Sequence, residues 1–465
     1  MCAVHIHSTE SKLPSSLKTL PGSRPLALSS SRPTWVRWQI MALLTALSML
    51  TYLDRLNLSI AGRNIQSDYA FSNQTMGWIF SAFILGYALF QIPGGLLGDR
   101  YGSHRILTLT IVCWSVLTAM TAIAPRLPWT AWLGVSWSFA IVRFLIGVGE
   151  AASLPNANKI VSNWIGHGHR GKGSSFTLIG IGAGGALTPP LISWVMQRWG
   201  WRSSFYLCGL IGLLFALIWH LRVTNRPEEH SRVNRAELEL IRSGQHSSPR
   251  LAGKVPWRMM LSSPSVWGLT LGYFCQGYPI YFFHTWFFIY LVRVRGFTVT
   301  QGGWWGSAPY LAIALLAPLG GWFSDLAVTK IGKRRGRQVA VWVGMGSSAA
   351  LIWIASHSTN AHQAVVLLAL GGGLNLFAAT SFWASCIDLT ESYTASLSGL
   401  MNAAGNFGGW LSPILTAYIA TRFGWNRALD CAAIVTVASG LFWIMVNAES
   451  SLDKRFTDKA LRQAT

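Results

Sequence analysis

Long apolar runs recur along almost the entire chain of 465 residues, and no other feature constrains the fold as strongly. A helix needs about 20 mostly apolar residues to cross the hydrocarbon core of a bilayer. About twelve runs reach that length, although ten spans would remain if two runs were buried re-entrant segments. The runs are 39–61, 75–97, 106–125, 131–154, 173–196, 203–221, 264–291, 304–324, 339–357, 362–385, 395–418 and 425–446. The sequence therefore predicts an all-α polytopic membrane protein.

Charged residues are scarce but strongly biased in sign. They make up 11% of the chain, compared with roughly a quarter of a soluble domain, and yet the formal net charge is +21. The Lys and Arg residues lie in short loops and tails between apolar runs, which is typical of cytoplasmic loops and argues against nucleic-acid binding. Six scattered Cys residues, none in a CxxC pair, indicate neither a disulfide framework nor a metal site. We expect no cofactor.

The basic loops alternate along the chain and so predict the topology. Both tails and every second connection carry the excess of Lys and Arg, which places both termini in the cytoplasm. Residues 1–38 and 447–465 are expected to be cytoplasmic tails, the first of them disordered. A polar stretch over 222–262 divides the runs six and six. Its acidic residues alternate with Arg, which predicts a solvated amphipathic linker helix; they are Glu228, Glu229, Glu237 and Glu239.

The two halves of the chain contain similar segments at corresponding places. Gly95-Leu-Leu-Gly-Asp99 closes the second run, and Gly321-Trp-Phe-Ser-Asp325 closes the eighth. A basic cluster and another apolar run follow each segment. Such a repeat is typical of a duplicated six-helix unit, so we expect two pseudo-symmetric bundles over 39–221 and 263–446.

The segment Gly95-x-x-x-Asp99-Arg100-x-Gly102-x-x-Arg105 resembles the signature that the major facilitator superfamily carries between its second and third helices. The resemblance implies that Asp99, Arg100 and Arg105 form a conformational latch, with Asp325 as its degenerate counterpart in the second half. His104 stands where the superfamily usually has Lys or Arg. The simpler interpretation of these charges is that they only orient the chain in the membrane.

A narrower resemblance covers residues 38–446 and is to the anion:cation symporter family, which includes bacterial sugar-acid importers. Five segments carry it in order along the chain. They are Tyr52-Leu-Asp54-Arg55-Leu-Asn57-Leu-Ser59, Gly86-Tyr87-Ala-Leu-Phe-Gln91-Ile-Pro93, Arg143-Phe-Leu-Ile-Gly147-Val-Gly149-Glu150, Trp286-Phe-Phe-Ile-Tyr290 and Asn402-Ala-Ala-Gly405-Asn406.

Four charged residues lie inside predicted spans: Asp54, Arg55, Arg143 and Glu150. A charge in the bilayer core costs at least about 2.5 kcal/mol, so a functional role is the default; the alternative is a structural network of buried ion pairs. Arg143 and Glu150 are seven residues apart, which places them on one helix face about 10 Å from each other. Arginine presents a planar fork that matches carboxylate, sulfonate or phosphate.

The resemblance implies a role for each polar residue of the expected site. Asp54 and Glu150 would take up the protons. Arg143 would lie by the substrate or control Glu150, and Arg55 would contact the substrate or gate the outer side. Tyr52 and Tyr87 would add to the same site from the first half. The second half would contribute Ser381, Trp383, Asn402 and Asn406, although Trp383 could be a core aromatic and Asn406 could bridge helices. His284 is a weaker candidate, and Asp388 and Glu391 are expected to be solvated at the outer mouth.

The sequence thus predicts a proton-coupled importer of a small organic anion, monomeric and multi-pass in a bacterial inner membrane. Its expected partners are the anion, protons and the lipid bilayer, and not nucleic acid. Two alternatives stay open: proton-coupled efflux or antiport of small molecules, and a non-transporting sensor on the same fold. Motifs of hydrolytic catalysis are absent from the sequence, so we do not expect an enzyme.

Overall fold

The computed structural model describes residues 32–165, 170–243, 257–390, 393–450 and 452–453. Parts of the two predicted tails (1–31 and 454–465) and of the predicted linker (244–256) lie outside these ranges. Within the described residues the elements are all helical. Ten segments are long and apolar enough to cross a membrane. Two further helices, α11 (Pro264–Thr285) and α17 (Thr394–Phe423), are of similar length but are not among these ten. The predicted all-α polytopic class is confirmed.

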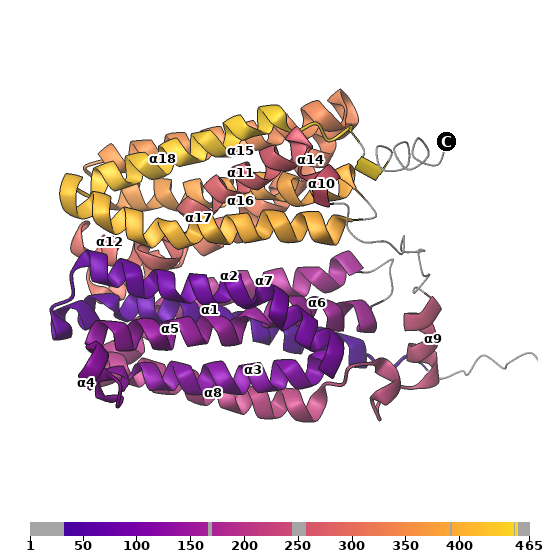
Figure 1. Cartoon of the computed structure of the whole chain (residues 1–465), viewed down its shortest axis with the longest axis horizontal. Helices are drawn as coiled ribbons and strands as arrows, with labels where there is room; N and C mark the ends of the chain where they lie inside the picture. Colours follow the sequence, from indigo (N-terminus) through magenta and orange to yellow (C-terminus); the bar gives the residue numbers. More distant parts are fainter. Residues whose placement is uncertain (1–31, 166–169, 244–256, 391–392, 451, 454–465) are drawn as a thin grey trace, which may run out of the picture.

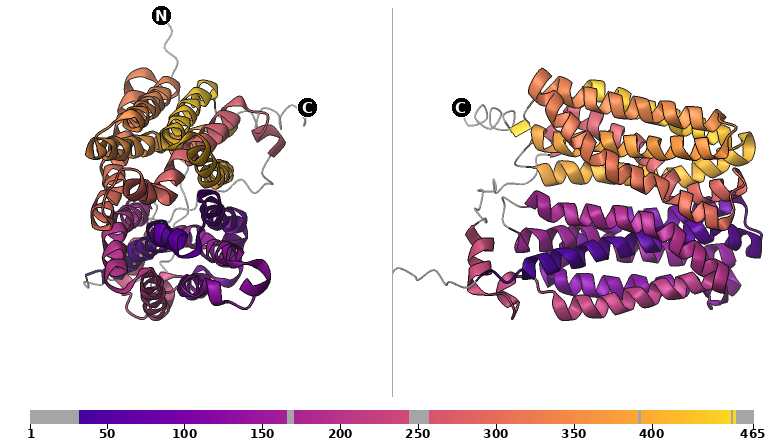
Figure 2. Two further views of the ribbon diagram at one scale, coloured as in Figure 1. Left: turned by 90° about the vertical axis from the view of Figure 1, so that its left-hand side faces the viewer. Right: turned by 180° about the vertical axis from the view of Figure 1, so that it is seen from behind.

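The helices form two bundles that lie side by side with their axes roughly aligned (Figures 1 and 2). The N-terminal bundle contains α1 (Val36–Tyr69), α2 (Asn73–Tyr101), α3 (Ser103–Thr121), α4 (Thr130–Leu133), α5 (Val135–Ala151), α6 (Ser153–Trp164), α7 (Arg170–Trp199) and α8 (Trp201–Arg222), with the short η1 (Ala124–Arg126). The C-terminal bundle contains α11 (Pro264–Thr285), α12 (Phe287–Arg293), α13 (Val299–Gly306), α14 (Ala308–Ile331), α15 (Lys333–His357), α16 (Ala361–Leu389), α17 (Thr394–Phe423) and α18 (Trp425–Phe442), with η4 (Trp443–Met445). Between them lie η3 (Pro227–Glu229), α9 (Arg235–Ser243) and α10 (Trp257–Met260).

Three of the predicted spans contain a break in the helix close to one end of the predicted range. The breaks fall at Ala152 between α5 and α6, at Trp286 between α11 and α12, and at Ser307 between α13 and α14. A hydroxyl next to the first break bonds back to the helix, because Ser153 donates to the carbonyl of Glu150 at 2.6 Å. Such bonds compete with the helical ladder and bend it. The first break leaves Glu150 in the last turn of α5.

Glycines allow α2 and α5 to approach closely. A Cβ atom at Gly147 would lie 2.1 Å from the carbonyl oxygen of Phe83, and one at Gly86 would lie 2.3 Å from that of Phe144. Neither distance is possible for a real side chain, so the contact requires glycine on both helices. This packing brings the face of α2 that carries Phe83 and Tyr87 against the charged face of α5.

We expect Gly147→Ala to destabilise the protein by about 1–3 kcal/mol, because the added methyl group must push α2 away from α5. The measurement is the apparent Tm of purified protein in detergent. Gly346→Ala in α15 is the matched control, since a Cβ there meets no atom within 4 Å. An equal Tm for both variants would contradict the close packing.

The two bundles are joined by side-chain hydroxyls that donate to backbone carbonyls. Ser59 of α1 donates to Thr285 at 2.6 Å, and Ser81 of α2 donates to Trp410 of α17 at 2.8 Å. From the C-terminal bundle to the N-terminal bundle, the hydroxyl of Ser307 donates to the backbone carbonyl of Ala186 of α7. These bonds, which we call the seam, lie in the second half of α1, the first half of α2 and the second half of α7. They therefore lie toward the end of the bundles that carries the α1–α2 connection.

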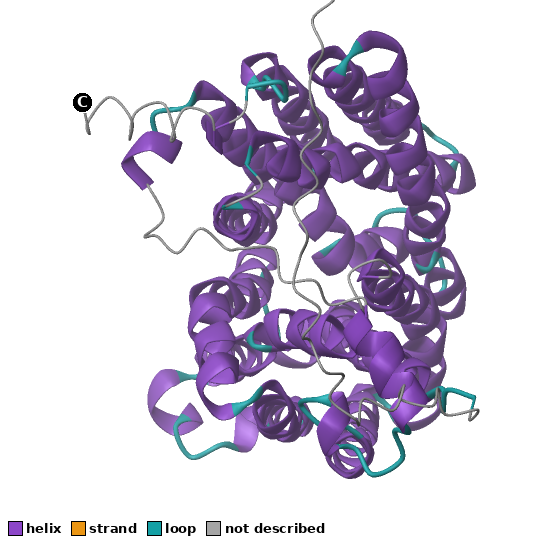
Figure 3. Cartoon of the chain, turned by 90° about the vertical axis from the view of Figure 1, so that its right-hand side faces the viewer, coloured by secondary structure: helices purple, strands orange, loops and turns teal. Residues whose placement is uncertain are grey.

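The linker helix α9 is fastened to the other end of the N-terminal bundle, which Figure 3 views directly. Glu237 is completely buried and accepts hydrogen bonds from the backbone N–H groups of Val36 (3.2 Å) and Arg37 (3.1 Å) and from the Thr34 hydroxyl. A carboxylate there satisfies the free N–H groups at the start of α1 and complements its dipole. The expectation that this acid is solvated was therefore wrong.

Candidate functional site

The centre of the N-terminal bundle holds an ion pair between α1 and α5. Arg55, near the middle of α1, donates from Nε to Glu150 Oε2 at 2.7 Å. The Glu150 side chain is fully buried, whereas that of Arg55 is 16% exposed. Among the described residues Arg55 makes no other hydrogen bond, so its two terminal NH2 groups are left for a ligand.

Aromatic rings surround the Arg55 guanidinium. Its central carbon lies 4.6 Å from the ring centre of Tyr87, 5.3 Å from that of Phe83 and 5.7 Å from that of Tyr52. Contacts of this kind attract a cation electrostatically and more strongly where water is excluded. The rings fix the plane of the guanidinium while Glu150 fixes one of its edges. The predicted residues Tyr52 and Tyr87 are thus brought together with Arg55.

Behind this pair lie two further charges with incomplete hydrogen bonding. Arg143 is 4% exposed and packs over the ring of Phe83 at 4.8 Å, and Asp54 is 3% exposed. Among the described residues, no partner binds Asp54 Oδ1, Glu150 Oε1 or Arg143 Nε. Buried polar groups are nearly always satisfied, and each exception calls for an explanation. Unpaired acceptors on two carboxyl groups are sites where a proton could bind.

Polar side chains of the C-terminal bundle face this group. Asn402 of α17 donates to Gln91 Oε1 of α2 at 3.1 Å, which links the two bundles. Tyr281 of α11 donates its hydroxyl to Asn406 Oδ1 at 3.0 Å. Asn402 and Asn406 are therefore placed at the junction of the bundles, as amides that could contact a bound ligand.

His284 connects the two bundles through its ring. It stacks on Tyr310 with centroids 6.0 Å apart and meets Tyr52 and Tyr281 edge-on at 5.6 and 5.4 Å. Since Tyr52 also packs against Arg55, this cluster continues the aromatic surround of the guanidinium into the C-terminal bundle.

The two remaining predicted residues have other hydrogen-bond partners in the C-terminal bundle. Trp383 is 43% exposed and donates from Nε1 to the hydroxyl of Tyr273 at 3.1 Å. Ser381 is fully buried and donates to Ser324 Oγ at 2.9 Å. Ser324 in turn accepts from Arg337, so Ser381 belongs to a different polar network.

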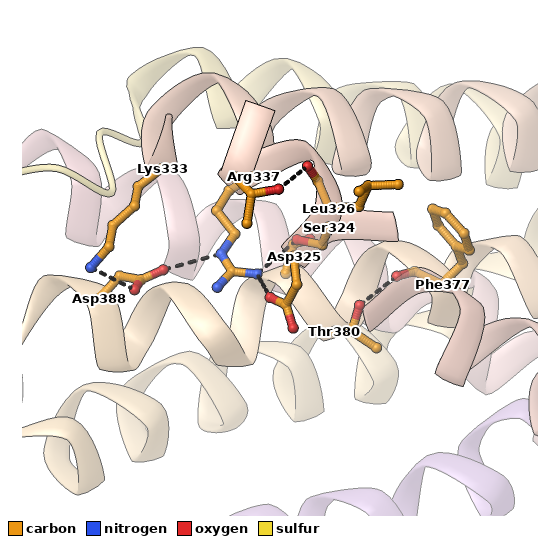
Figure 4. A network of polar contacts seen from close by, with 10 residues as sticks. Ser324, Asp325, Leu326, Lys333, Arg337, Phe377, Thr380 and Asp388 are labelled. Carbon is orange, nitrogen blue, oxygen red and sulfur yellow. Dashed lines mark hydrogen bonds and ion pairs between the residues drawn. The ribbon is translucent and has the colours of Figure 1, made fainter. Parts of the chain in front are cut away.

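That network ties together α14, α15 and α16 (Figure 4). Arg337 donates to Asp325 Oδ1 at 2.8 Å and to Asp388 Oδ2 at 3.1 Å, and Lys333 lies 3.4 Å from Asp388. The expectation that Asp388 is solvated at the outer mouth was wrong, because α16 ends beside the α14–α15 connection and its side chain is only 12% exposed. Glu391 lies outside the described residues.

Comparison with known proteins assigns the family. The family model of the Major Facilitator Superfamily matches residues 44–413, which is most of the chain. The chain belongs to the major facilitator superfamily. This membership confirms the predicted resemblance and the prediction of a transporter rather than an enzyme.

Several curated relatives are similar over most of their length. The probable galactarate/D-glucarate transporter GudP of Bacillus subtilis is 32% identical over 90% of this chain and 93% of its own. The chloroplastic ascorbate transporter of Arabidopsis thaliana is 30% identical over 92% and 78%. The probable sulfoacetate transporter SauU of Cupriavidus necator is 29% identical over 83% and 88%. These names all describe transporters of organic anions.

A solved structure of the superfamily shows the same fold. The bacterial homologue of the human lysosomal transporter Spinster superimposes with a TM-score of 0.72. The alignment covers 90% of this chain and 98% of that one, at 18% sequence identity.

The superfamily signature spans the end of α2 and the start of α3, at the end of the bundle that carries α9. Arg100 and Arg105 are exposed, and the Arg100 guanidinium lies 5.3 Å from the ring centre of Tyr101. The side chain of Asp99 lies outside the described residues. The latch role of these three residues therefore stays a prediction, whereas Asp325 is held by Arg337 in the matching place of the C-terminal bundle.

We expect Arg337→Gln to destabilise the protein by up to about 3 kcal/mol, because Asp388 loses its main partner. This value is the lower end of the range for breaking a buried ion pair. Adding Asp388→Asn should restore part of that loss, which a double-mutant cycle on the apparent Tm would measure. Arg335→Gln is the control, since Arg335 is an exposed neighbour on the same helix. Additive effects of the two substitutions would contradict a coupled pair.

Gln91, Tyr281 and Phe83 contact predicted site residues but were not themselves predicted as part of the site. Gln91 carried a usable signal, because a polar amide within an apolar run of α2 obeys the same rule that singled out Asp54 and Arg55. Tyr281 and Phe83 carried none, since aromatic residues are frequent in all the apolar runs and only the packing distinguishes these two.

Proposed function

We propose that this chain is a secondary active transporter that takes up a small organic anion together with protons. The observation that carries the proposal is the Arg55–Glu150 pair, in which a partly exposed guanidinium keeps two NH2 groups for a ligand while its counter-ion is completely buried. A carboxylate, sulfonate or phosphate matches the free edge of that fork.

Coupling to protons follows from competition for Arg55. When a substrate anion binds the guanidinium, Glu150 shares its positive partner and becomes a less compensated buried charge. Binding a proton at Glu150 removes that charge, so the anion raises the affinity for protons and protons raise the affinity for the anion by the same factor. Asp54, with one unpartnered oxygen, is proposed as a second proton site. Arg143 is proposed to stabilise the deprotonated form of both.

A polyhydroxylated acid is the substrate class that the surroundings favour. Next to Arg55 lie the phenol groups of Tyr52 and Tyr87, and the amides of Gln91 and Asn402 bond across the bundle junction. Such groups can donate to and accept from substrate hydroxyls. The name of the Bacillus subtilis relative, a galactarate/D-glucarate transporter, supports the same class.

Transport requires the site to open to each side in turn. We propose that the units 39–221 and 263–446 rock against each other as a monomer, with the seam closing one side in the conformation seen here. The Asp99, Arg100 and Arg105 segment and the Asp325–Arg337 pair would hold other conformations. We propose a bacterial inner membrane location, and the basic loops support an orientation with both termini in the cytoplasm.

The test is uptake into proteoliposomes of the purified full chain. With the exterior acidic, labelled D-glucarate should accumulate above its external concentration, and a protonophore should abolish the accumulation. A competing panel of sugar acids, dicarboxylates and sulfonates would rank the substrates. Accumulation driven only by the opposite gradient would favour efflux or antiport, and binding without movement would favour a sensor. Failure of every acid in the panel to bind would overturn the proposal.

A further inference from the structure

A groove of about 580 Å³ opens on the N-terminal bundle, far from the Arg55 site. It is lined by the beginning of α1, the end of α8 and the segment that follows α8. Its lining residues are Gln39, Ile40, Ala42, Leu43, Ile218, Leu221, Arg222, His230 and Arg232. The groove has an apolar part made by helices and a basic part made by the chain beyond them.

The apolar part belongs to the membrane-spanning segments. Ile40 and Leu43 lie in the first turns of the candidate span Val36–Tyr69, and Ile218 and Leu221 lie in the last turns of the candidate span Trp201–Arg222. Ile218 and Leu221 are 48% and 70% exposed, which in a bilayer means exposure to lipid. The groove therefore crosses the boundary between hydrocarbon and headgroups.

The basic part is built by one histidine and two arginines. The His230 ring lies 3.2 Å from the Arg222 carbonyl through Nε2, and its Nδ1 accepts from the backbone N–H of Arg232 at 3.2 Å. The rings of His230 and Trp164 also pack edge to face, with their centroids 5.6 Å apart. This arrangement fits a neutral imidazole with its proton on Nε2, which fixes the backbones of the two arginines near each other.

The charge of the groove is not neutralised by the acids nearby. Glu228 pairs with Arg242 at 3.0 Å, and Glu229 accepts from the backbone N–H of Arg226. Glu237 is committed to the start of α1. Among the described residues, neither the Arg222 nor the Arg232 side chain has an acidic partner, so the rim carries two uncompensated positive charges.

We propose that this groove binds one anionic phospholipid. Arg222 and Arg232 bind the phosphate, and an acyl chain lies along Leu43, Ile218 and Leu221. A free phosphate ion would bind at the basic part of the groove but not along its apolar part. A zwitterionic lipid brings a positive group of its own and leaves the net charge of the groove unchanged, whereas an anionic lipid lowers it. The lipid would bridge α1 and α8 beside the linker that Glu237 fastens to α1. This inference does not depend on the transported substrate.

The test is native mass spectrometry of the purified full chain with added dioleoyl phosphatidylglycerol or dioleoyl phosphatidylcholine. Wild-type protein should retain one phosphatidylglycerol and lose phosphatidylcholine at the same activation energy. The double variant Arg222→Gln/Arg232→Gln should bind phosphatidylglycerol about tenfold more weakly or worse, since each basic residue near an anionic headgroup contributes to affinity. The control Arg258→Gln/Arg335→Gln removes the same charge from exposed positions elsewhere and should bind like wild type.

A second variant probes the apolar part of the groove without changing its charge. Leu43→Trp should fill the groove and weaken phosphatidylglycerol retention while both arginines remain. Equal retention of the two lipids by wild-type protein, a result that needs no variant to fold, would overturn the proposal. So would full displacement of the lipid by millimolar glycerol phosphate, or undiminished retention by the Arg222/Arg232 double variant.

Discussion

Replacing Arg55 by glutamine should abolish binding of the organic anion. A hydrogen bond to a charged group contributes about 1.5–3 kcal/mol, so losing the two that a bidentate carboxylate would make weakens binding by at least about a hundredfold. Isothermal titration calorimetry of D-glucarate into purified protein would measure the change in Kd. Arg63→Gln is the matched control, because Arg63 is an exposed residue of the same helix and its substitution removes the same charge.

A structural role for Arg55 predicts a different pattern. The Arg55→Gln variant leaves Glu150 buried and without its partner, which by itself would lower the Tm. Adding Glu150→Gln removes that charge and should recover stability. If binding stays lost in the stable double variant, Arg55 contacts the anion; if binding returns with stability, the pair is structural and the proposed role of Arg55 is wrong.

Replacing Glu150 by glutamine should abolish accumulation driven by the proton gradient but preserve exchange of anion for anion. The glutamine amide oxygen can still accept from Arg55 Nε, so the geometry at 2.7 Å is kept. What is lost is the group that changes its proton occupancy when the anion binds. Uptake should then stop once the internal anion equals the external concentration. Parallel assays of counterflow and of uphill uptake in proteoliposomes would separate the two activities.

Two comparisons sharpen that result. Asp68→Asn makes the same acid-to-amide change at the exposed end of α1, where Asp68 pairs with Arg202, and should leave uphill uptake intact. Asp54→Asn tests the second proposed proton site. Undiminished uphill uptake in Glu150→Gln would remove Glu150 from the proton path and transfer the role to Asp54.

The spans and the bundle pattern were predictable because hydropathy is a property of each segment alone. Asp54, Arg55, Arg143 and Glu150 were found by the same reasoning, since a charge inside an apolar run is visible without any knowledge of packing. Which of them pair was not visible. Arg143 and Glu150 share a face of α5, yet the direct partner of Glu150 is Arg55 from α1. That choice depends on how the helices pack, including the glycine contact between α2 and α5.

Two acids were misplaced for a related reason. Glu237 was expected in water because it alternates with arginines along a polar segment, but the free N–H groups of α1, two hundred residues earlier, form a better site for it. Asp388 was read as a solvated end of a span, whereas Arg337 and Lys333 from another helix meet it there. Local patterns reveal that a residue is polar, and only tertiary contacts reveal its partner.

The seam has a consequence for how such a protein diverges during evolution. Ser59, Ser81 and Ser307 all donate to backbone carbonyls, and a carbonyl persists whatever side chain its residue carries. Substitutions at Thr285, Trp410 or Ala186 therefore leave the acceptors in place, and each bond depends on a single hydroxyl. The facing surface can drift to suit a new substrate without a compensating mutation across the interface.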